Sequence, residues 1–280
     1  MDIYATDIDP QDSPLPVEIV ETDIDLYYHL ALSMYVEIEC NNSAGRNSVF
    51  ILPVGPVYQY RRFVRLCRFR PLDLSRLHCF FMDEYLDEAG KRLNPDHPLS
   101  FRGFIRRELL EPMPREMNLR DEQVQFPDPE DPAEYDRRLE RLGGADICFA
   151  GVGINGHLAF NEPPDTNRAD MNRADTESFK RLPTRVLSLS RETVTINSNT
   201  ALRGALERVP RRAVTVGFRQ IFESGSIRVY LNRPWQSSVV RKILYGRKSA
   251  HFPASLLRDH RDARLVMTPE VASRPQFRLK

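Results

Sequence analysis

Short apolar runs alternate along the chain with longer segments in which apolar residues recur every three or four positions. The short runs predict β-strands at 49–52, 79–82, 146–150, 186–189, 213–216, 227–231 and 265–268. The longer spacing predicts helices from residue 22 onward, around 63–67, and at about 100–110, 131–142, 191–208, 237–245 and 253–259. Because strands and helices alternate, we expect an α/β fold with a mostly parallel sheet and helices on both faces.

Three of the predicted strands end in segments that carry polar or glycine residues. These segments are Pro-Val-Gly-Pro at 53–56, Asp-Glu-Tyr at 83–85 and Gly-Val-Gly-Ile-Asn-Gly-His at 151–157. The carboxyl ends of parallel strands meet at one edge of a sheet, where ligands of such folds bind. The pattern therefore predicts that these three segments share one site.

The third segment contains a G-x-G-x-x-G motif, at Gly151, Gly153 and Gly156. A dinucleotide site needs a helix that opens at the third glycine. Only six residues separate that glycine from the Pro163-Pro164 pair, and the polar stretch 165–173 has no apolar periodicity. We therefore expect no nucleotide cofactor.

Composition narrows the possible partners and sites. The 40 Lys and Arg residues nearly balance the 39 Asp and Glu residues, so no overall field favours nucleic acid or an anionic membrane. The four cysteines are scattered without ligand spacing, so neither a disulfide framework nor a metal site is expected. Residues 1–16 hold three prolines and are interpreted as an extended lead-in to one domain at 17–280. With no signal peptide or apolar span in the sequence, we expect a cytoplasmic protein.

The strand ends offer groups that can move protons. Asp83 and Glu84 can serve as a turn or helix cap, but a carboxyl group half-buried beside Phe80 or Phe81 also has a pKa raised toward neutrality. A lone histidine such as His157 is more often structural than catalytic. Its flanking glycines expose it, however, and Glu162 can orient its ring.

Asn155 can fix the same histidine or bind a substrate hydroxyl. Ser188, Ser190 and Thr193 have no second histidine near them in the sequence, and G-x-S-x-G is absent, so a serine-hydrolase triad is not predicted.

Three stretches of the chain resemble the glucosamine-6-phosphate deaminase (isomerase) family, which shares a superfamily with the 6-phosphogluconolactonases. They are Phe-Met-Asp-Glu-Tyr at 81–85, Asp-His-Pro-x-Ser-Phe at 96–101 and Gly-x-Asn-Gly-His-Leu-Ala-Phe-Asn-Glu-Pro at 153–163. Weaker similarity extends the resemblance over about residues 20–270, through 184–185, 213–217 and 252–260.

The resemblance implies a single modified Rossmann-like domain that converts an amino-sugar phosphate into a keto-sugar phosphate and ammonia without a cofactor. His157 would open the pyranose ring, and Asp83 would carry a proton between C2 and C1. Glu162, with Asn155, would hold and tune the histidine. Many members of the family are oligomers, so the resemblance also implies a homo-oligomer.

The chain departs from the family pattern where the phosphate would bind. The family often has Asp at the position of Asn155, and a Thr-Gly-Gly-Thr-type loop where this chain has residues 53–57. Basic residues expected farther on fall at Asn199 and Gln236. Backbone amides near Gly55 and a cation elsewhere could bind the phosphate, and Glu84 is a further candidate for substrate contact. The candidate cations, each of which can equally be a surface arginine, are Arg185, Arg219 and Arg233.

Two other functions remain open from the sequence. A non-catalytic sugar-phosphate sensor on the same fold would suit Asn155 and the altered loop. A sugar-phosphate lactonase is the third possibility, but the string Leu-Ala-Phe-Asn-Glu-Pro at 158–163 differs from the Thr-Ala-Ser-Leu-Phe-Pro-like string usual in lactonases. We rank the deaminase first, then the sensor, then the lactonase.

Overall fold

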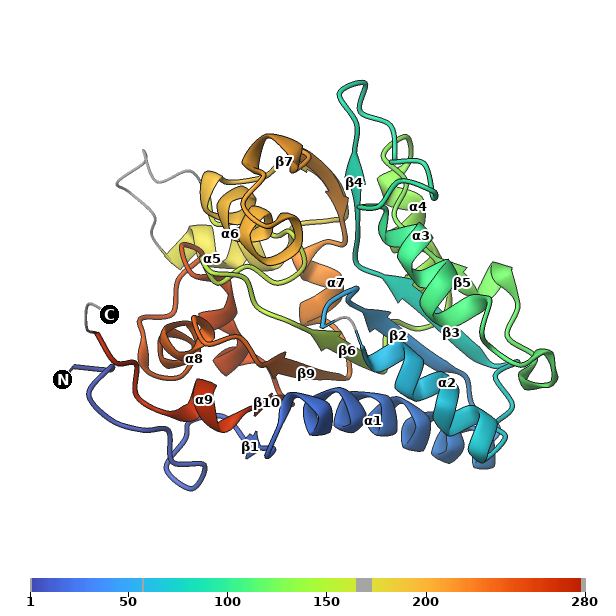
Figure 1. Ribbon diagram of the computed structural model, residues 1–280, viewed down its shortest axis with the longest axis horizontal. Helices are drawn as coiled ribbons and strands as arrows, with labels where there is room; N and C mark the ends of the chain where they lie inside the picture. The colour runs from blue at the N-terminus through green and yellow to red at the C-terminus, as the bar shows by residue number, and fades with distance from the viewer. Residues whose placement is uncertain (1, 57, 165–172, 278–280) are drawn as a thin grey trace.

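The protein is built on a seven-stranded sheet in which every pair of neighbouring strands is parallel (Figure 1). The computed structural model describes residues 2–56, 58–164 and 173–277. In spatial order the strands are β1 (Val17–Ile19), β10 (Ala263–Met267), β9 (Ser226–Leu231), β6 (Ile147–Ala150), β2 (Ser48–Leu52), β3 (Leu77–Phe81) and β5 (Val124–Gln125). The predicted α/β fold class is confirmed.

Helices cover both faces of this sheet because successive side chains of each strand point to opposite faces. In β2, Phe50 and Leu52 pack into one core and Val49 and Ile51 into the other. The first core is closed by α1 (Asp23–Ser43), α2 (Gln59–Phe69), α3 (Phe101–Ile105) and a π-helical turn (Arg106–Leu110). The second is closed by α4 (Pro132–Arg141), α7 (Phe218–Phe222), α8 (Gln236–Tyr245) and α9 (Pro269–Ala272).

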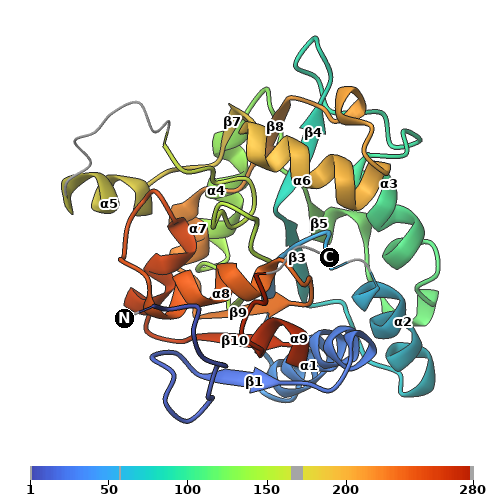
Figure 2. The same cartoon turned by 60° about the vertical axis from the view of Figure 1, so that its left-hand side comes forward.

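A second, antiparallel sheet of three strands lies above the main one. Its order is β4 (Asp83–Leu86), β8 (Arg212–Thr215) and β7 (Arg185–Ser188). Residues 83–85, expected as a turn or cap after a strand, instead begin β4, with Asp83 paired to Thr215. Figures 1 and 2 both place this sheet and α6 (Arg191–Leu202) at the end of the molecule opposite α1.

Several helices differ in length or type from the sequence expectation. The segment expected as one helix at 191–208 ends at Leu202, because Arg203 adopts a left-handed conformation (φ 52°) before Gly204, and a 3₁₀ turn follows at Leu206–Arg208. The segment 253–259 is a 3₁₀ helix. The polar stretch after Pro164 lies largely outside the described residues, which resume with α5 (Arg173–Lys180). Strands β1 and β5 and the short 3₁₀ turns Arg115–Met117 and Asp121–Gln123 were not foreseen.

The lead-in packs against the main domain. Ile8 and Leu15 are buried in the same core as α8, and the backbone carbonyl of Thr6 accepts a hydrogen bond from Arg241. Within the described ranges, no helix is long and apolar enough to cross a membrane.

Candidate active site

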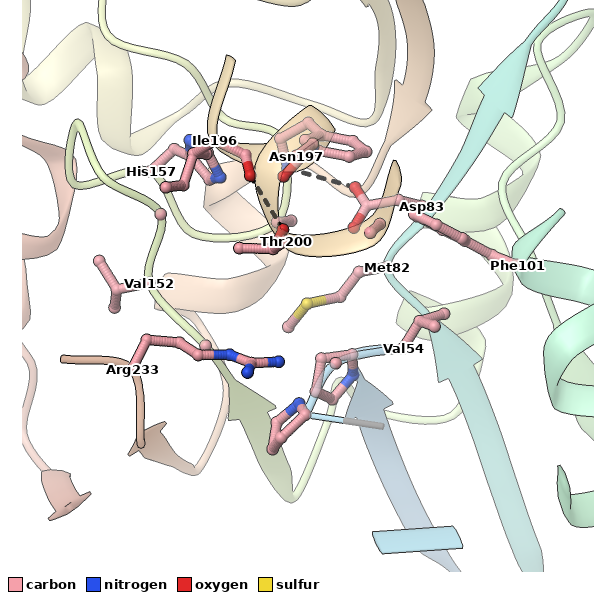
Figure 3. Close-up of a pocket in the computed structure, with 18 of the residues that line it drawn as sticks. Val54, Met82, Asp83, Phe101, Val152, His157, Ile196, Asn197, Thr200 and Arg233 are labelled. Carbon is pink, nitrogen blue, oxygen red and sulfur yellow. Dashed lines mark hydrogen bonds between the residues drawn. The ribbon is translucent and has the colours of Figure 1, made fainter. Parts of the chain in front are cut away.

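A cavity of about 390 Å³ lies at the topological switch point of the main sheet, between β2 and β6 (Figure 3). The later strands β3 and β5 lie on the β2 side of this point, and β9 and β10 lie on the β6 side. Open α/β sheets bind ligands at this switch point, and the volume falls in the range of small-molecule sites. Residues 53–56 and 151–153, which follow β2 and β6, line the cavity together with Met82 and Asp83. The predicted convergence of the three strand-end segments is confirmed.

Asp83 occupies the junction between the two sheets and is buried. Its Oδ1 accepts hydrogen bonds from the backbone N–H of Phe160 (3.2 Å) and from the Thr215 hydroxyl, and Oδ2 has no hydrogen-bond partner among the described residues. Burial raises the pKa of Asp83 to about 7, although the two hydrogen bonds act in the opposite direction. A carboxyl group with this pKa can both take and return a proton near neutral pH.

His157 lies in a hydrogen-bond network that fixes which of its ring nitrogens carries a proton. The Asn155 amide nitrogen donates to Glu162 Oε2 (2.7 Å), so the amide oxygen of Asn155 faces His157 Nδ1 at 2.8 Å. Nδ1 must then carry a proton, so in the neutral ring the lone pair lies on Nε2. Glu162 Oε2 lies 3.6 Å from the same Nδ1. Burial acts to raise the pKa of Glu162, but His157 and Asn155 outweigh it and hold the pKa at about 2.

The amino-terminal turn of α6 completes this network with two residues that the sequence reasoning set aside. Ser190, the N-cap of α6, donates its backbone N–H to Glu162 Oε1 (3.2 Å), and its hydroxyl accepts from Asn155 (3.2 Å). The hydroxyl of the fully buried Thr193 lies 3.2 Å from His157 Nδ1. The capping pattern Ser190-x-x-Thr193 was a visible signal for the helix start, but not for contact with the histidine.

Two glycines are required by close packing around His157. A Cβ on Gly153 would lie 2.1 Å from His157 Cε1, so any other residue would displace the imidazole. Gly156 has φ of +85°, and a Cβ there would lie 2.7 Å from the Phe252 ring. The glycines of the G-x-G-x-x-G string therefore shape the turn around the histidine.

Glu84 is fully buried and is not itself among the residues that line the cavity. It accepts hydrogen bonds from the backbone N–H groups of Phe101 and Arg102 and from the Ser100 hydroxyl, each at 3.0 Å. A carboxylate in this place caps the amino terminus of α3. The cap that was one interpretation of the Asp83-Glu84 pair is therefore made by Glu84.

The three candidate arginines occupy different surroundings. Arg233 extends from the end of β9 into the cavity, toward Val54 on the β2 side (Figure 3). Arg185 instead donates to Asn161 Oδ1 (2.8 Å), and Arg219 pairs with Glu140 (2.8 Å); neither lines the cavity. Gly55, next to Val54 in the loop after β2, also lines the cavity.

Gln236, where a basic residue was expected, uses both ends of its amide to hold the strand-end loops. Its oxygen accepts from the backbone N–H groups of Asn232 and Arg233 (both 2.9 Å), and its nitrogen donates to the Val152 carbonyl (2.9 Å). Asn199, the other such position, is exposed on α6 and does not line the cavity. Across the described ranges, no cluster of three or more His, Cys, Asp or Glu side chains could hold a metal ion.

Sequence comparisons relate the chain to deaminases of amino-sugar phosphates. No family model matches it. It is 28% identical over 235 residues to the glucosamine-6-phosphate deaminase of Thermoanaerobacter sp. (strain X514), across 81% of this chain and 83% of the relative. The glucosamine-6-phosphate deaminase of Clostridium beijerinckii is 27% identical over 235 residues, across 81% of this chain and 87% of the relative.

Solved structures give the same relation. A monomeric glucosamine-6-phosphate deaminase, described as a missing link of the NagB superfamily, matches with a TM-score of 0.75 and 25% identity, over 91% of this chain and 98% of its own. The 6-phosphogluconolactonase of Trypanosoma brucei has a TM-score of 0.65 at 17% identity, over 91% and 97%, and shares the fold. The predicted resemblance to the deaminase family is confirmed.

Proposed function

We propose that this chain, a relative of the glucosamine-6-phosphate deaminases, is an aldose–ketose isomerase and deaminase acting on an amino-sugar phosphate. The observation that carries the proposal is that Asp83, with its pKa near 7, and His157, held by Asn155 and Glu162, line one cavity. A proton carrier and a tautomer-fixed imidazole are the two groups that ring opening and isomerisation require.

The proposed reaction begins with His157. Its Nε2 takes the proton of the anomeric hydroxyl and returns it to the ring oxygen, which opens the pyranose to the aldehyde. Glu162, ionised because its pKa is about 2, stabilises the imidazolium formed in passing. The Asn155 oxygen accepts a hydrogen bond from Nδ1 and keeps it protonated, so Nε2 is the nitrogen that transfers the proton.

Asp83 then moves hydrogen within the open chain. Its carboxylate removes the proton from C2 and, after the double bond shifts and a proton of the amino group passes to O1, delivers it to C1. The resulting imine at C2 takes up one water and releases ammonia, leaving the ketose phosphate. In the isomerisation, hydrogen moves only from one atom of the substrate to another, so the reaction needs no electron acceptor. We therefore propose no cofactor and no metal.

The phosphate is proposed to bind between Arg233 and the loop that contains Gly55. Arg233 supplies the charge from one side of the cavity, and the absence of a side chain at Gly55 lets the group approach the backbone on the other. Arg185 and Arg219 are held by Asn161 and Glu140, which argues against either as the phosphate ligand. Glu84, occupied as a helix cap, is no longer proposed for substrate contact.

We further propose a homo-oligomer in the cytoplasm. Assembly is supported by exposed apolar side chains on α1, although one structural relative is described as monomeric. The proposed location follows from the metabolic role of the relatives.

Turnover assays test the function. Purified protein is incubated with glucosamine-6-phosphate, galactosamine-6-phosphate and 6-phosphogluconolactone, and ammonia, ketose phosphate and acid are measured. We expect ammonia and ketose phosphate in equal amounts from one of the amino sugars. Binding without turnover would favour the sensor, and acid release from the lactone alone would favour the lactonase.

The phosphate ligand is tested by Arg233→Ala. Losing one charged hydrogen-bonding partner should raise KM for the phosphorylated substrate by about 10- to 100-fold. Arg219→Ala, which removes a cation outside the cavity, is the matched control and should leave KM unchanged. A raised KM in the Arg219 variant alone would refute the assignment.

A further inference from the structure

The end of the cavity at Asp83 offers two hydrogen-bond acceptors that the protein itself does not use. Asp83 Oδ2 and Asn197 Oδ1 have no hydrogen-bond partner among the described residues, and neither oxygen is sealed inside the protein. Both side chains line the cavity, and Figure 3 shows Asn197 of α6 across the cavity from Arg233. A ligand whose phosphate lies at Arg233 therefore meets these acceptors with its other end.

Contacts around Phe160 place the two acceptors close together. Asp83 and Tyr85 are two positions apart on β4, so their side chains point to the same side of the strand. The ring of Phe160 packs against those of Tyr85 (5.5 Å between centroids) and His157 (6.0 Å), and its backbone N–H donates to Asp83. Tyr85 Oη accepts a hydrogen bond from Asn197 Nδ2 (2.9 Å). Asn197 thus reaches the end of the cavity that holds the two proposed catalytic groups.

Tyr85 fixes the direction of the Asn197 amide. The tyrosine is buried, and its ring packs against Phe101 at 4.8 Å between centroids. Because the amide nitrogen of Asn197 is committed to the Tyr85 hydroxyl, the amide oxygen is the end left for a ligand. Leu202 and Val209, which belong to the same apolar cluster as Tyr85, also line the cavity. In apolar surroundings, an unpaired acceptor favours a ligand that brings a hydrogen-bond donor.

The proposed reaction determines which part of the substrate meets these acceptors. Asp83 removes the proton from C2, and C2 also carries the amino group, so the amino nitrogen must lie one bond from the carbon that faces Asp83. An amino group offers two hydrogens, or three when protonated, whereas a hydroxyl group at C2 offers one. Two acceptors, of which one is a carboxyl group, therefore suit an amino group better than a hydroxyl group.

We propose that Asn197 selects 2-amino sugars by accepting a hydrogen bond from the amino group of the substrate, and that Tyr85 positions it. This inference rests on the proposed function, because it takes C2 of the substrate to lie at Asp83. Asn197 determines specificity by direct contact, whereas Tyr85 acts only through Asn197. The preferred substrate is then a 2-amino-2-deoxy aldose phosphate, and the matching 2-hydroxy sugar phosphate binds more weakly.

Paired unreactive analogues measure this preference. 2-Amino-2-deoxyglucitol 6-phosphate and glucitol 6-phosphate lack the aldehyde at C1 and differ from each other only at C2; the galactitol pair is measured in the same way. Calorimetric titration gives the dissociation constant of each compound. Wild type should bind the amino compound of at least one pair about 10-fold more tightly than its hydroxyl partner, because a charge-assisted hydrogen bond is stronger than a neutral one.

Substitutions at Asn197 should move this ratio of dissociation constants in opposite directions. Asn197→Leu removes the acceptor and should lower the ratio at least ~5-fold, since one such hydrogen bond is lost. Asn197→Asp offers the amino group a charged acceptor and should raise the ratio. Tyr85→Phe keeps the packed ring but frees the amide, so it should lower the ratio by less than Asn197→Leu does.

Two residues of α6 provide matched controls. Thr200 lines the cavity one helical turn after Asn197, and its hydroxyl donates to the Ile196 carbonyl of the same helix (2.9 Å). Asn199 is exposed and does not line the cavity. Thr200→Val and Asn199→Leu should both keep the wild-type ratio. Circular dichroism checks that every variant is folded.

The outcomes separate this inference from the proposed function. Equal binding of the amino and hydroxyl compounds to wild type, or a ratio unchanged in both Asn197 variants, would overturn the role of Asn197 and leave the proposed function standing. An equal loss of the ratio in Thr200→Val would also overturn it, and a wild-type ratio in Tyr85→Phe would refute the positioning role. Failure of wild type to bind any of the four compounds would contradict the proposed function itself.

Discussion

Asp83 takes its proton affinity from its neighbours rather than from its residue type. Burial at the junction of two sheets disfavours the carboxylate, while the Thr215 hydroxyl and the Phe160 N–H favour it. The effect of burial is larger than that of the two hydrogen bonds, and the pKa of Asp83 reaches about 7. The balance depends on Thr215, which is 132 positions away in the sequence.

The pH dependence of turnover should report this balance. Asp83 acts as a base only when ionised, so kcat should rise as the pH increases through about 7. Thr215→Val removes a hydrogen bond that lowers the pKa of Asp83, so in this variant kcat should rise at a higher pH than in wild type. Asp83→Asn should lower kcat by at least ~10²-fold. Thr215→Ser keeps the hydroxyl and is the control; a Thr215→Val profile that matches it would contradict the assignment.

Asn155→Asp tests the network around His157. The new carboxylate would face Glu162, whose Oε2 now accepts a hydrogen bond from Asn155 at 2.7 Å. We expect a loss of about 1–3 kcal/mol in the free energy of unfolding at pH 7. Repulsion raises the folded-state pKa of one carboxyl above its unfolded value, so stability should return as the pH falls through that pKa. Urea denaturation of the variant and of wild type, at pH 7 and at lower pH, measures this change in the free energy of unfolding.

Asn199→Asp, on the exposed face of α6, is the control for that variant. A pH-independent difference between Asn155→Asp and wild type would show that charge repulsion is not the cause.

At the scale of elements, β4 joins catalysis to helix capping. Asp83 begins the strand and faces the cavity, while the next residue, Glu84, points the other way and binds the amino terminus of α3. Successive side chains of a strand alternate in direction, so two adjacent acids serve two different elements. A turn at 83–85 would have allowed both to face the substrate.

Glu84→Gln should therefore affect stability rather than substrate binding. The amide replaces an ionised acceptor of four hydrogen bonds with a neutral group that has one acceptor oxygen. We expect the free energy of unfolding to fall by about 2–4 kcal/mol, measured by urea denaturation, with KM little changed. Glu88→Gln, at an exposed position, is the control. Unchanged stability with a raised KM would return Glu84 to the substrate site.

At the scale of the whole molecule, Arg241 ties the two ends of the chain to the core. It is fully buried, and its guanidinium donates to the carbonyl groups of Thr6 (2.9 Å), Ser237 (2.7 Å) and Ala272 (2.8 Å). Burial lowers its pKa. The lead-in and the last helix are thus held by one side chain of α8.

Arg241→Met should loosen this arrangement. The substitution keeps much of the apolar volume but leaves buried carbonyl groups without a donor, which should cost at least ~2 kcal/mol of unfolding free energy. Thermal unfolding measures the loss, and turnover of the folded protein should stay the same because Arg241 does not line the cavity. Arg261→Met, at an exposed site, is the control. A difference below ~0.5 kcal/mol between the two variants would contradict the role.

Much of the local structure could be predicted from the sequence. Apolar runs located seven of the ten strands but missed β1 and β5, which are only three and two residues long, and β4, which begins with two acidic residues. The Thr22–Asp25 capping pair fixed the start of α1. The motif at 153–163 brought Asn155, His157 and Glu162 into the candidate site, because residues this close in sequence fold into one turn.

The sequence by itself determined where most of the strands and helices lie and which chemical groups stand at the strand ends, because periodicity and side-chain chemistry are local properties. Only the tertiary structure decided that Thr215 would bind Asp83 and that Ser190 and Thr193 would support His157. It also decided that Arg233, and neither Arg185 nor Arg219, would enter the cavity. These outcomes depend on which distant strands and helices pack together, and a local pattern of apolar and polar residues specifies burial without specifying the partner.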